Sequence, residues 1–454
     1  MTAREGSLDA PTRHAIAWQD PAFVDPDRID AELRRVFDVC HGCRRCFNLC
    51  DSFPRLFDLI DEAPTGELDS VDSKDFKPVI DACTLCDMCF MTKCPYVPPH
   101  EFDLDFPHLM LRVRHAEFRR GEVGAMDKKL ADTDGNGKLG TTFSPLANWA
   151  CRRDNGLTRP IMEKVAGIDR KAELPAFNPK SFVASAKAAP VKANKEAPAA
   201  GRKAVLYATC FSNWNDAAIG EATRQVLAHN GVEVEVLHPA CCGMPYMEQG
   251  DLAEVTKRAR QVAAALLPYV DKGWDIVAPV PSCALMMKFE WPLICPDDAD
   301  IKRLALATRD ASEYVMEIAR KEGLVAGMSA VAEPVTLHIA CHARAQNMGA
   351  KAAEMLRLLP DAKVNVVERC SGHGGSWGVK KEFFEVGMKV GKPVIRNAAE
   401  HDPEGAGYIV SECPLAGMHI RQGVEESEGR SAPPPQAAHP IQLIARAYGL
   451  GGAA

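Results

Sequence analysis

The stretch HPACCGMP, residues 238–245, sets two cysteines side by side, with glycine behind them and proline on both flanks. Neighbouring cysteines rarely form a disulfide with each other, because that bond strains the peptide between them. The pair follows an apolar strand pattern, and cysteines recur after other such patterns along the chain. Counterparts lie 131, 129 and 130 residues apart, which predicts an internal duplication. The counterpart pairs are Cys210 and Cys341, Cys241 and Cys370, and Cys283 and Cys413.

Alternating strand and helix patterns surround these cysteines. Short runs rich in valine, isoleucine and leucine are separated by longer helical patterns, which is typical of a parallel α/β sheet. Because ligands of such sheets bind beyond the carboxyl ends of the strands, we expect the cysteines of each half to converge at one sheet edge. The six predicted strands cover residues 203–209, 232–239, 275–281, 335–340, 363–368 and 407–411, and a helical stretch is expected around 301–322.

Two cysteine-dense runs precede the duplicated region. CHGCRRCFNLC (40–50) has C-x2-C-x2-C-x3-C spacing, and CTLCDMCFMTKC (83–94) has one more residue before its last cysteine, which a small loop can absorb. In two-cluster ferredoxins the fourth cysteine of each run ligates the other cluster. A zinc site is the alternative, but two complete runs disfavour it. The sequence predicts one [4Fe–4S] cluster on Cys40, Cys43, Cys46 and Cys94, and a second on Cys83, Cys86, Cys89 and Cys50.

Composition limits the class of protein. The 454 residues carry a formal net charge of −7 without a basic block, which disfavours a nucleic-acid partner. No stretch approaches 18 uninterrupted apolar residues, and the N-terminus lacks the pattern of a signal peptide. We therefore expect a cytoplasmic protein, in which the 17 cysteines serve metal ligation or redox chemistry rather than a disulfide framework.

The predicted fold is multidomain α+β. A mainly helical two-cluster ferredoxin domain precedes a duplicated α/β (parallel sheet) cysteine-rich domain. Between them lies a segment rich in alanine, lysine and proline, which is typical of a linker. The expected units are a tail at 1–30, the ferredoxin-type domain at 31–177, the linker at 178–202, repeat 1 at 203–325, repeat 2 at 326–425, and a Pro-rich segment with a terminal helix at 426–454.

A two-cluster domain followed by two Cys…Cys-Cys-Gly…Cys patterns resembles the iron–sulfur subunits related to heterodisulfide reductase, such as those of anaerobic glycerol-3-phosphate dehydrogenase and of glycolate oxidase. The resemblance spans nearly all the chain, from about residue 30 to the terminal helix. It implies further iron–sulfur clusters in the cysteine-rich halves. It also implies electron flow between a flavoprotein partner and a quinone or disulfide acceptor.

The first half matches the family pattern better than the second. It supplies Cys210, Cys241, Cys242 and Cys283, although Met286 stands where the motif often ends in a further cysteine. A thioether is a poor substitute for a thiolate as an iron ligand. Four thiolates remain, which are enough for one ordinary cluster. The alternative is that these cysteines are small buried apolar residues.

The second half has lost part of the pattern. Ser371 stands at the place of Cys242, and Ala416 stands opposite Met286. The remaining Cys341, Cys370 and Cys413 suit a cluster with an open iron site, a metal completed by a histidine, or no metal. Nearby His338, His342 and His373 are expected as hydrogen-bonding neighbours more than as ligands. Gly372, Gly374 and Gly375 are expected to let the backbone approach whatever occupies the site.

One motif is set aside. DTDGNGKLG, residues 132–140, begins like a calcium-binding loop, but Phe143 stands at the twelfth position, where a bidentate glutamate is needed. An exposed turn is the expectation there.

We expect an iron–sulfur electron-transfer subunit that passes electrons through two [4Fe–4S] clusters to or from a further cluster in the cysteine-rich domain. No catalytic residue is assigned, and whether the chain is itself an enzyme stays open. Its expected partner is a flavoprotein dehydrogenase or another redox protein, and a quinone is one possible acceptor. The expected location is the cytoplasm, with peripheral attachment to the inner face of the membrane as the alternative. The alternatives are an enzyme that reduces a disulfide at the repeat 1 cysteines, and a zinc or redox sensor.

Overall fold

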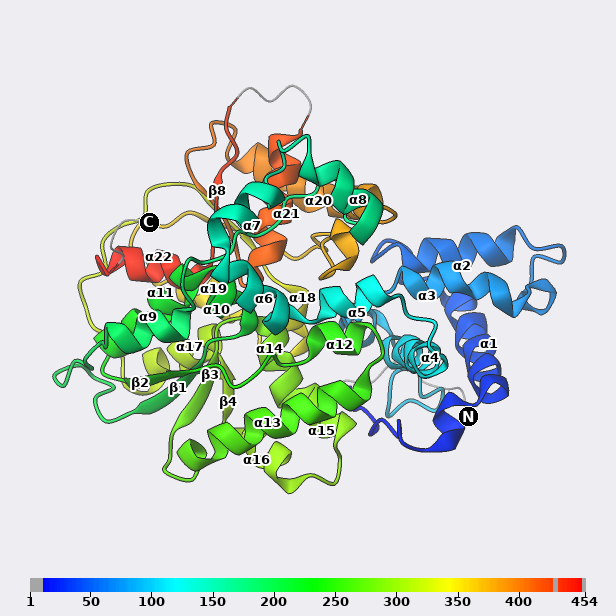
Figure 1. The fold of residues 1–454 in the computed structure, drawn as a ribbon, viewed down its shortest axis with the longest axis horizontal. Helices are drawn as coiled ribbons and strands as arrows, with labels where there is room; N and C mark the ends of the chain where they lie inside the picture. Colours follow the sequence, from blue (N-terminus) through cyan, green and yellow to red (C-terminus); the bar gives the residue numbers. More distant parts are fainter. Residues whose placement is uncertain (1–10, 428–431, 451–454) are drawn as a thin grey trace.

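The computed structural model describes residues 11–427 and 432–450. The first ten residues of the predicted tail, residues 428–431 of the Pro-rich segment and residues 451–454 lie outside the described residues. Figure 1 shows the N-terminal helices to one side of two sheet domains, which lie next to each other.

The first sheet has four parallel strands in the order β2-β1-β3-β4. Its central strand β1 is buried over four of its five residues, as expected for a strand covered on both faces. The strands are β1 (Lys203–Tyr207), β2 (Glu233–Leu237), β3 (Asp275–Ala278) and β4 (Thr308–Asp310).

The second sheet repeats this topology, with four parallel strands in the order β6-β5-β7-β8. Each strand therefore has a counterpart at the same place in the other sheet, which confirms the duplication and the α/β class. The strands are β5 (Val335–His338), β6 (Val364–Val367), β7 (Tyr408–Ser411) and β8 (Gln436–Ala438).

The fourth strand of each sheet was not predicted. β4 and β8 have three residues each, with the sequences TRD and QAA, and so carry no apolar run. The helix expected around 301–322 is therefore wrong in its middle, because β4 separates α16 (Ala299–Ala307) from α17 (Ala311–Lys321). Pairing with a neighbouring buried strand outweighs local propensity at such short edges.

Helices cover both sheets, and the terminal helix α22 (Pro440–Ala447) packs between the repeats. Its Ile441 and Ile444 are fully buried in a core shared by β1 and β5. The other helices of repeat 1 are α10 (Cys210–Trp214), α11 (Ala217–His229), α12 (Met244–Glu248), α13 (Leu252–Val270), α14 (Pro281–Leu285), η5 (Met286–Glu290) and α15 (Trp291–Ile294). Those of repeat 2 are α18 (Cys341–Ala345), α19 (Lys351–Leu356), η6 (Trp377–Val379), α20 (Phe384–His401) and α21 (Pro414–Glu425).

The N-terminal part is helical, as predicted, and several of its helices begin at side-chain caps. Asp25 caps α1, and Asp105 caps α4, which ends at Gly121 in the left-handed conformation. The elements up to residue 131 are η1 (Pro21–Val24), α1 (Pro26–Cys43), α2 (Ser52–Asp61), η2 (Leu68–Ser70), η3 (Ser73–Phe76), α3 (Lys77–Asp81), η4 (Cys89–Lys93), α4 (Phe106–Arg120) and α5 (Ala125–Ala131).

Three further helices form a segment that we call the helical strap, because it crosses from repeat 1 to repeat 2. At one end Trp214 of repeat 1 donates from Nε1 to Asp134, and at the other Ile168 pairs with Lys380 of repeat 2. Figure 1 shows the strap in front of both repeats. Its helices are α6 (Thr133–Thr142), α7 (Ser144–Cys151) and α8 (Thr158–Ala166).

The segment expected as a linker carries a helix, α9 (Phe182–Ala188). Phe182 is only 1% exposed and fills the space beside Gly220 on α11. The alanines that suggested a linker are small enough to pack, and Ala186 and Ala199 are buried. The segment therefore lies against repeat 1.

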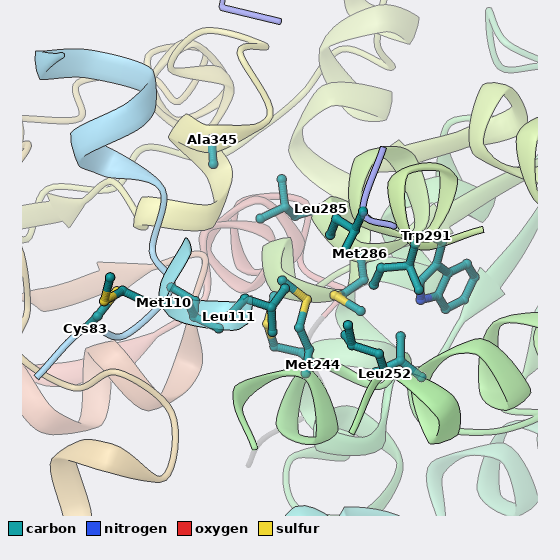
Figure 2. Packing of buried hydrophobic residues seen from close by; sticks show 14 of the residues in the cluster. Cys83, Met110, Leu111, Met244, Leu252, Leu285, Met286, Trp291 and Ala345 are labelled. Carbon is teal, nitrogen blue, oxygen red and sulfur yellow. The ribbon is translucent and has the colours of Figure 1, made fainter. Parts of the chain in front are cut away.

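One hydrophobic core joins the helical domain to repeat 1 (Figure 2). Met110 and Leu111 of α4 meet Met244 and Leu285 of repeat 1 in this core. At its edge Gly250 has a φ of +79°, and a β-carbon there would overlap the Arg114 carbonyl of α4. Gly250 therefore allows the close approach of the two parts.

Gly250→Ala tests this contact. Gly273 is a matched control, because its φ is also +79° but no atom lies within 4 Å of its β-carbon position. Gly273→Ala should lower the free energy of unfolding by about 1 kcal/mol through backbone strain, and Gly250→Ala by roughly 1–3 kcal/mol more through overlap. Urea unfolding measures both values, and equal losses would contradict the tight contact.

Candidate metal centres

Four thiols of the helical domain surround a small cavity. Cys40 and Cys43 lie on the last turn of α1, and the cavity is closed by Phe53 and Phe57. Burial raises the pKa of Cys40, and the nearby Cys94 raises it further. The cysteines that line the cavity are Cys40, Cys43, Cys46 and Cys94. The structure thus brings the last cysteine of the second run to the first three cysteines of the first run.

A second group of thiols lies deeper in the helical domain. Burial raises the pKa of Cys50, and Cys86 and Cys83 add to this effect. Burial likewise raises the pKa of Cys89, with contributions from Cys86 and Cys83. The last cysteine of the first run has therefore joined the second run, as the predicted pairing requires. The group comprises Cys50, Cys83, Cys86 and Cys89.

The extra residue in the second run is accommodated by a π-helical turn, not by a loop. η4 spans Cys89–Lys93, and the Cys94 N–H donates to the Cys89 carbonyl over five residues. A π-turn holds one residue more than an α-turn and often occurs at functional sites.

The loop around Cys86 is held in an unusual conformation by a buried cation. Leu85 and Asp87 have φ angles of 50° and 65°, which non-glycine residues rarely adopt. Arg13 binds both carboxylate oxygens of Asp87, at 2.9 and 2.7 Å, and also contacts Glu290 of repeat 1 at 3.1 Å. This ion network, which carried no sequence motif, ties the second thiol group to repeat 1.

Repeat 1 brings its four predicted cysteines together beyond the carboxyl ends of its strands. Cys210 begins α10 directly after β1, and its Sγ lies 3.8 Å from that of Cys241. The thiol contact with Cys241, together with burial, raises the pKa of Cys210. Contacts with Cys241 and Cys283 raise that of Cys242, whereas hydrogen bonds from Cys210 and Cys242 lower that of Cys241.

The backbone of the CCG turn is fixed by three side chains. The Tyr207 hydroxyl donates to the Ala240 carbonyl at 2.6 Å, and Trp291 Nε1 donates to the Cys242 carbonyl at 2.9 Å. From the strap, the Asp134 carboxylate accepts from the Cys241 N–H at 2.6 Å. Such outer contacts orient metal ligands. Their residue types gave no signal in the sequence.

Asp134 belongs to the motif expected to form an exposed turn, and that expectation is wrong. The residues form α6, which packs closely because Gly137 faces Trp214 and Gly140 faces Phe177 without a β-carbon between them. Asp134 also contacts His238 Nε2 at 2.6 Å. Burial opposes its ionisation, but the bond from His238 and those from Trp214 and Cys241 lower the pKa of Asp134.

Repeat 2 places its three cysteines beside the second thiol group. Burial raises the pKa of Cys341, and Cys86, Cys370 and Cys413 contribute. Burial raises the pKa of Cys86 to about 12, with Cys370 as the next largest cause. On the other side, Cys283 of repeat 1 is among the groups that raise the pKa of Cys413 to about 11, after burial. The repeat 2 thiols therefore lie between the second thiol group and repeat 1.

Two of the three histidines near the repeat 2 cysteines hydrogen-bond to protein groups, whereas Nε2 of the third, His373, is buried without a partner among the described residues. His338 contacts Ser411 Oγ and the Arg369 carbonyl, each at 3.0 Å. His342 contacts Ser282 Oγ at 2.8 Å and the Leu85 carbonyl at 3.4 Å. His373 is buried against His419, and burial lowers its pKa to about 3.

The glycines of repeat 2 approach protein. A β-carbon on Gly372 would overlap the Gly387 carbonyl of α20, and one on Gly374 would lie 2.6 Å from the Thr84 methyl group. Gly375 packs in the same way against Glu248. We expected these glycines to make room for a ligand, but in the structure they make room for neighbouring parts of the protein.

The thiol groups fit iron–sulfur clusters better than single metal ions. Within residues 11–427 and 432–450, no three His, Cys, Asp or Glu side chains converge as ligands of one ion. Thiols in sets of three or four around a shared space, buried among apolar side chains, suit a multinuclear cluster. Bound iron also removes the cost of ionising several buried thiols together.

A polar cleft of about 280 Å³ lies beside Cys83, where the helical domain and both repeats meet. Glu248 of α12 lines it, together with Arg114 and Lys380. Burial raises the pKa of Glu248 to about 7, although Arg114 and Lys380 oppose this shift. No sequence pattern indicated this carboxyl.

Two α/β repeats with thiols at the strand ends, after a helical domain with two further thiol groups, define a cysteine-rich iron–sulfur redox protein. The family model for the CCG cysteine-rich domain matches residues 204–288 and again 335–421, one match for each sheet. The chain belongs to this family of proteins with duplicated CCG cysteine-rich domains.

Two relatives match this chain over about three quarters of their own lengths. A relative from Escherichia coli (strain K12), one of the subunits of anaerobic glycerol-3-phosphate dehydrogenase, is 25% identical over 323 residues, 70% of this chain and 76% of the relative. Lactate utilization protein A of Geobacillus kaustophilus is 30% identical over 189 residues, 39% of this chain and 75% of the relative. Among the described residues, no helix is long and apolar enough to cross a membrane.

Glu248→Gln tests the buried carboxyl in the cleft. Since the pKa of Glu248 is raised from 4.5 to about 7, the stability it contributes is present at low pH and is lost as the pH rises towards 7. Between pH 6 and pH 8 the wild-type free energy of unfolding should fall by about 1 kcal/mol more than that of the variant.

Glu382→Gln is the control, because Glu382 lines the same cleft but is exposed. It should keep the wild-type pH dependence in urea unfolding at the two pH values. An identical pH response of wild type and Glu248→Gln would contradict the raised pKa.

Proposed function

We propose that the chain is the iron–sulfur electron-transfer subunit of an oxidoreductase. The observation that carries the proposal is the order of its thiol groups, which follow one another from the helical domain through repeat 2 to repeat 1. Iron–sulfur clusters supply one-electron transfer. The first two groups would each hold a [4Fe–4S] cluster, with Cys40, Cys43, Cys46 and Cys94 as one ligand set and Cys83, Cys86, Cys89 and Cys50 as the other.

Repeat 1 would hold a further cluster on Cys210, Cys241, Cys242 and Cys283. Tyr207, Trp291 and Asp134 keep the CCG turn in place through its backbone, so the thiols do not have to reorganise when the charge of the site changes. In repeat 2, Cys341, Cys370 and Cys413 would hold a metal between this site and the second thiol group.

A redox partner would exchange electrons at the first thiol group. Cys40, Cys43, Cys46 and Cys94 are all only partly buried, and Phe47, which follows Cys46 in the chain, is 57% exposed. An exposed aromatic side chain next to a cofactor site suits a docking partner. The name of one relative supports a dehydrogenase subunit in this role, because that relative is a subunit of glycerol-3-phosphate dehydrogenase, and the family resemblance implies that the partner is a flavoprotein. We further propose a quinone as the acceptor, and a place on the cytoplasmic face of a membrane.

Reduction of a disulfide at repeat 1 is a weaker alternative. A disulfide substrate must reach the thiols or their cluster, yet Cys241, Cys242 and Cys283 are at most 4% exposed. Their burial favours electron transfer through this site over chemistry on a bound substrate.

Cys242→Ser tests the repeat 1 site. Protein purified without oxygen should hold at least about eight irons, with a further cluster in repeat 1, and the variant should lose about one cluster of iron and sulfide. Cys295→Ser is the control, because Cys295 is buried in the same repeat but its Sγ faces Thr256 Oγ1 at 3.6 Å. Fewer than about eight irons in wild type, or zinc near one per chain, would contradict the proposal.

Single serine variants test the exchange of cysteines between the two runs. Cys50→Ser should change the same paramagnetic signal as Cys86→Ser, and Cys94→Ser the same signal as Cys43→Ser, because each pair shares a cluster. Electron paramagnetic resonance of the dithionite-reduced proteins compares them. If Cys50→Ser instead matched Cys43→Ser, each run would hold its own cluster.

A further inference from the structure

The helical strap carries a dense set of exposed apolar side chains. Thirteen large apolar side chains are exposed among the described residues, and seven of them lie between residues 139 and 165. Scattered exposed apolar residues are normal, but seven of thirteen on a single segment indicate an interaction surface. The seven, which we call the strap face, are Leu139, Phe143, Leu146, Trp149, Leu157, Ile161 and Val165.

The strap face is held rigidly from below. Its residues recur at helical spacing, as in Leu157, Ile161 and Val165 of the α8 region, and the opposite sides of the helices are packed. Arg159 on the buried side is 2% exposed and donates to the Asp169 and Ala172 carbonyls, each at 2.7 Å. The apolar side chains therefore cannot turn inward without breaking this packing.

Two lysines of the strap are exposed and unpaired among the described residues, whereas most of its other charges have partners. Residues 133–166 contain five basic and three acidic residues. Arg152 pairs with Asp154, Glu163 with Arg170, and Arg153 with Glu425 and Glu426 of repeat 2. Lys138 and Lys164 are exposed, and in the described part of the chain neither forms an ion pair with a carboxylate.

We propose that the strap face binds the surface of an anionic phospholipid bilayer. Apolar side chains with an interfacial tryptophan, flanked by lysines that no carboxylate neutralises, are the features of helices that lie in a membrane interface. Each lysine near an anionic surface adds a favourable electrostatic contribution. A second copy of this chain, whose net charge is −7, would not need these two lysines beside Leu139 and Val165, whereas lipid phosphates would bind them.

The position of the strap face indicates which thiol group would deliver electrons to the acceptor. This inference rests on the proposed function. α6 begins beside the repeat 1 thiols, where Asp134 accepts from the Cys241 N–H, and ends at Thr142, next to Phe143 of the strap face. Ten helical residues span about 15 Å. Binding through the strap face would therefore place the repeat 1 site near the bilayer, within reach of an acceptor dissolved in lipid.

Vesicle flotation with the full chain tests the surface. Wild type should float with vesicles of phosphatidylglycerol and phosphatidylethanolamine, and the triple variant L146E/L157E/I161E should bind roughly tenfold more weakly or not at all. Leu306→Glu is the matched control, because Leu306 is 78% exposed on α16, outside the strap, and this variant should bind like wild type.

Variants with altered charge complete the experiment, together with the oligomeric state of the protein in solution. K138E/K164E should weaken binding, as should vesicles of neutral phosphatidylcholine or added salt. Wild type that stays unbound, or that binds as tightly as the triple variant, would overturn the proposal. A wild-type dimer that the triple variant converts to a monomer would also overturn it, by assigning the face to a second copy.

Iron content and spectra of the same variants separate this proposal from the function. The strap face does not touch the thiols, so L146E/L157E/I161E should keep the wild-type iron content. A chain that binds vesicles but lacks clusters would refute the proposed function alone, whereas a chain with all clusters and no vesicle binding would refute the membrane surface alone.

Discussion

Gathering cysteine thiols in a buried place is the constraint on which the rest of the structure depends. Burial and neighbouring thiols raise the pKa of most of these cysteines. The grouped thiols therefore do not stabilise their own arrangement. The surrounding chain supplies the order instead, through backbone contacts such as those of Tyr207 and Trp291 with the CCG turn. Parallel strands serve this need, because their carboxyl ends bring distant segments to one edge.

The two repeats share a topology but differ in how their sites are completed. Repeat 1 has four thiols of its own, and the strap covers them with Asp134. Repeat 2 has Ser371 in place of the second cysteine of the pair, and its three thiols lie against Cys86 of the helical domain. The repeat with one cysteine fewer is therefore the repeat whose thiols lie against another thiol group.

The sequence predicted the features that repeat or that follow a fixed spacing. Strands with buried valine and isoleucine runs and the six cysteines behind them were readable, as was the grouping of Cys94 with Cys40 and of Cys50 with Cys86. β4 and β8 were not, because three polar or small residues become strands only beside a neighbour. The contacts of Arg13 and Asp134 were equally unreadable, since each joins residues more than 70 positions apart. Arg13 has no motif, and the motif that contains Asp134 resembles a calcium-binding loop and gives no indication of a contact with the CCG turn.

The exchange of Cys50 and Cys94 between the two runs has a consequence for biosynthesis. The first thiol group includes Cys94, whereas the second is complete once Cys89 has been made. On the ribosome, the group that begins earlier in the chain is therefore the later of the two to be completed. A cell that loads metal during translation would meet only three cysteines at the first group until residue 94 has left the exit tunnel.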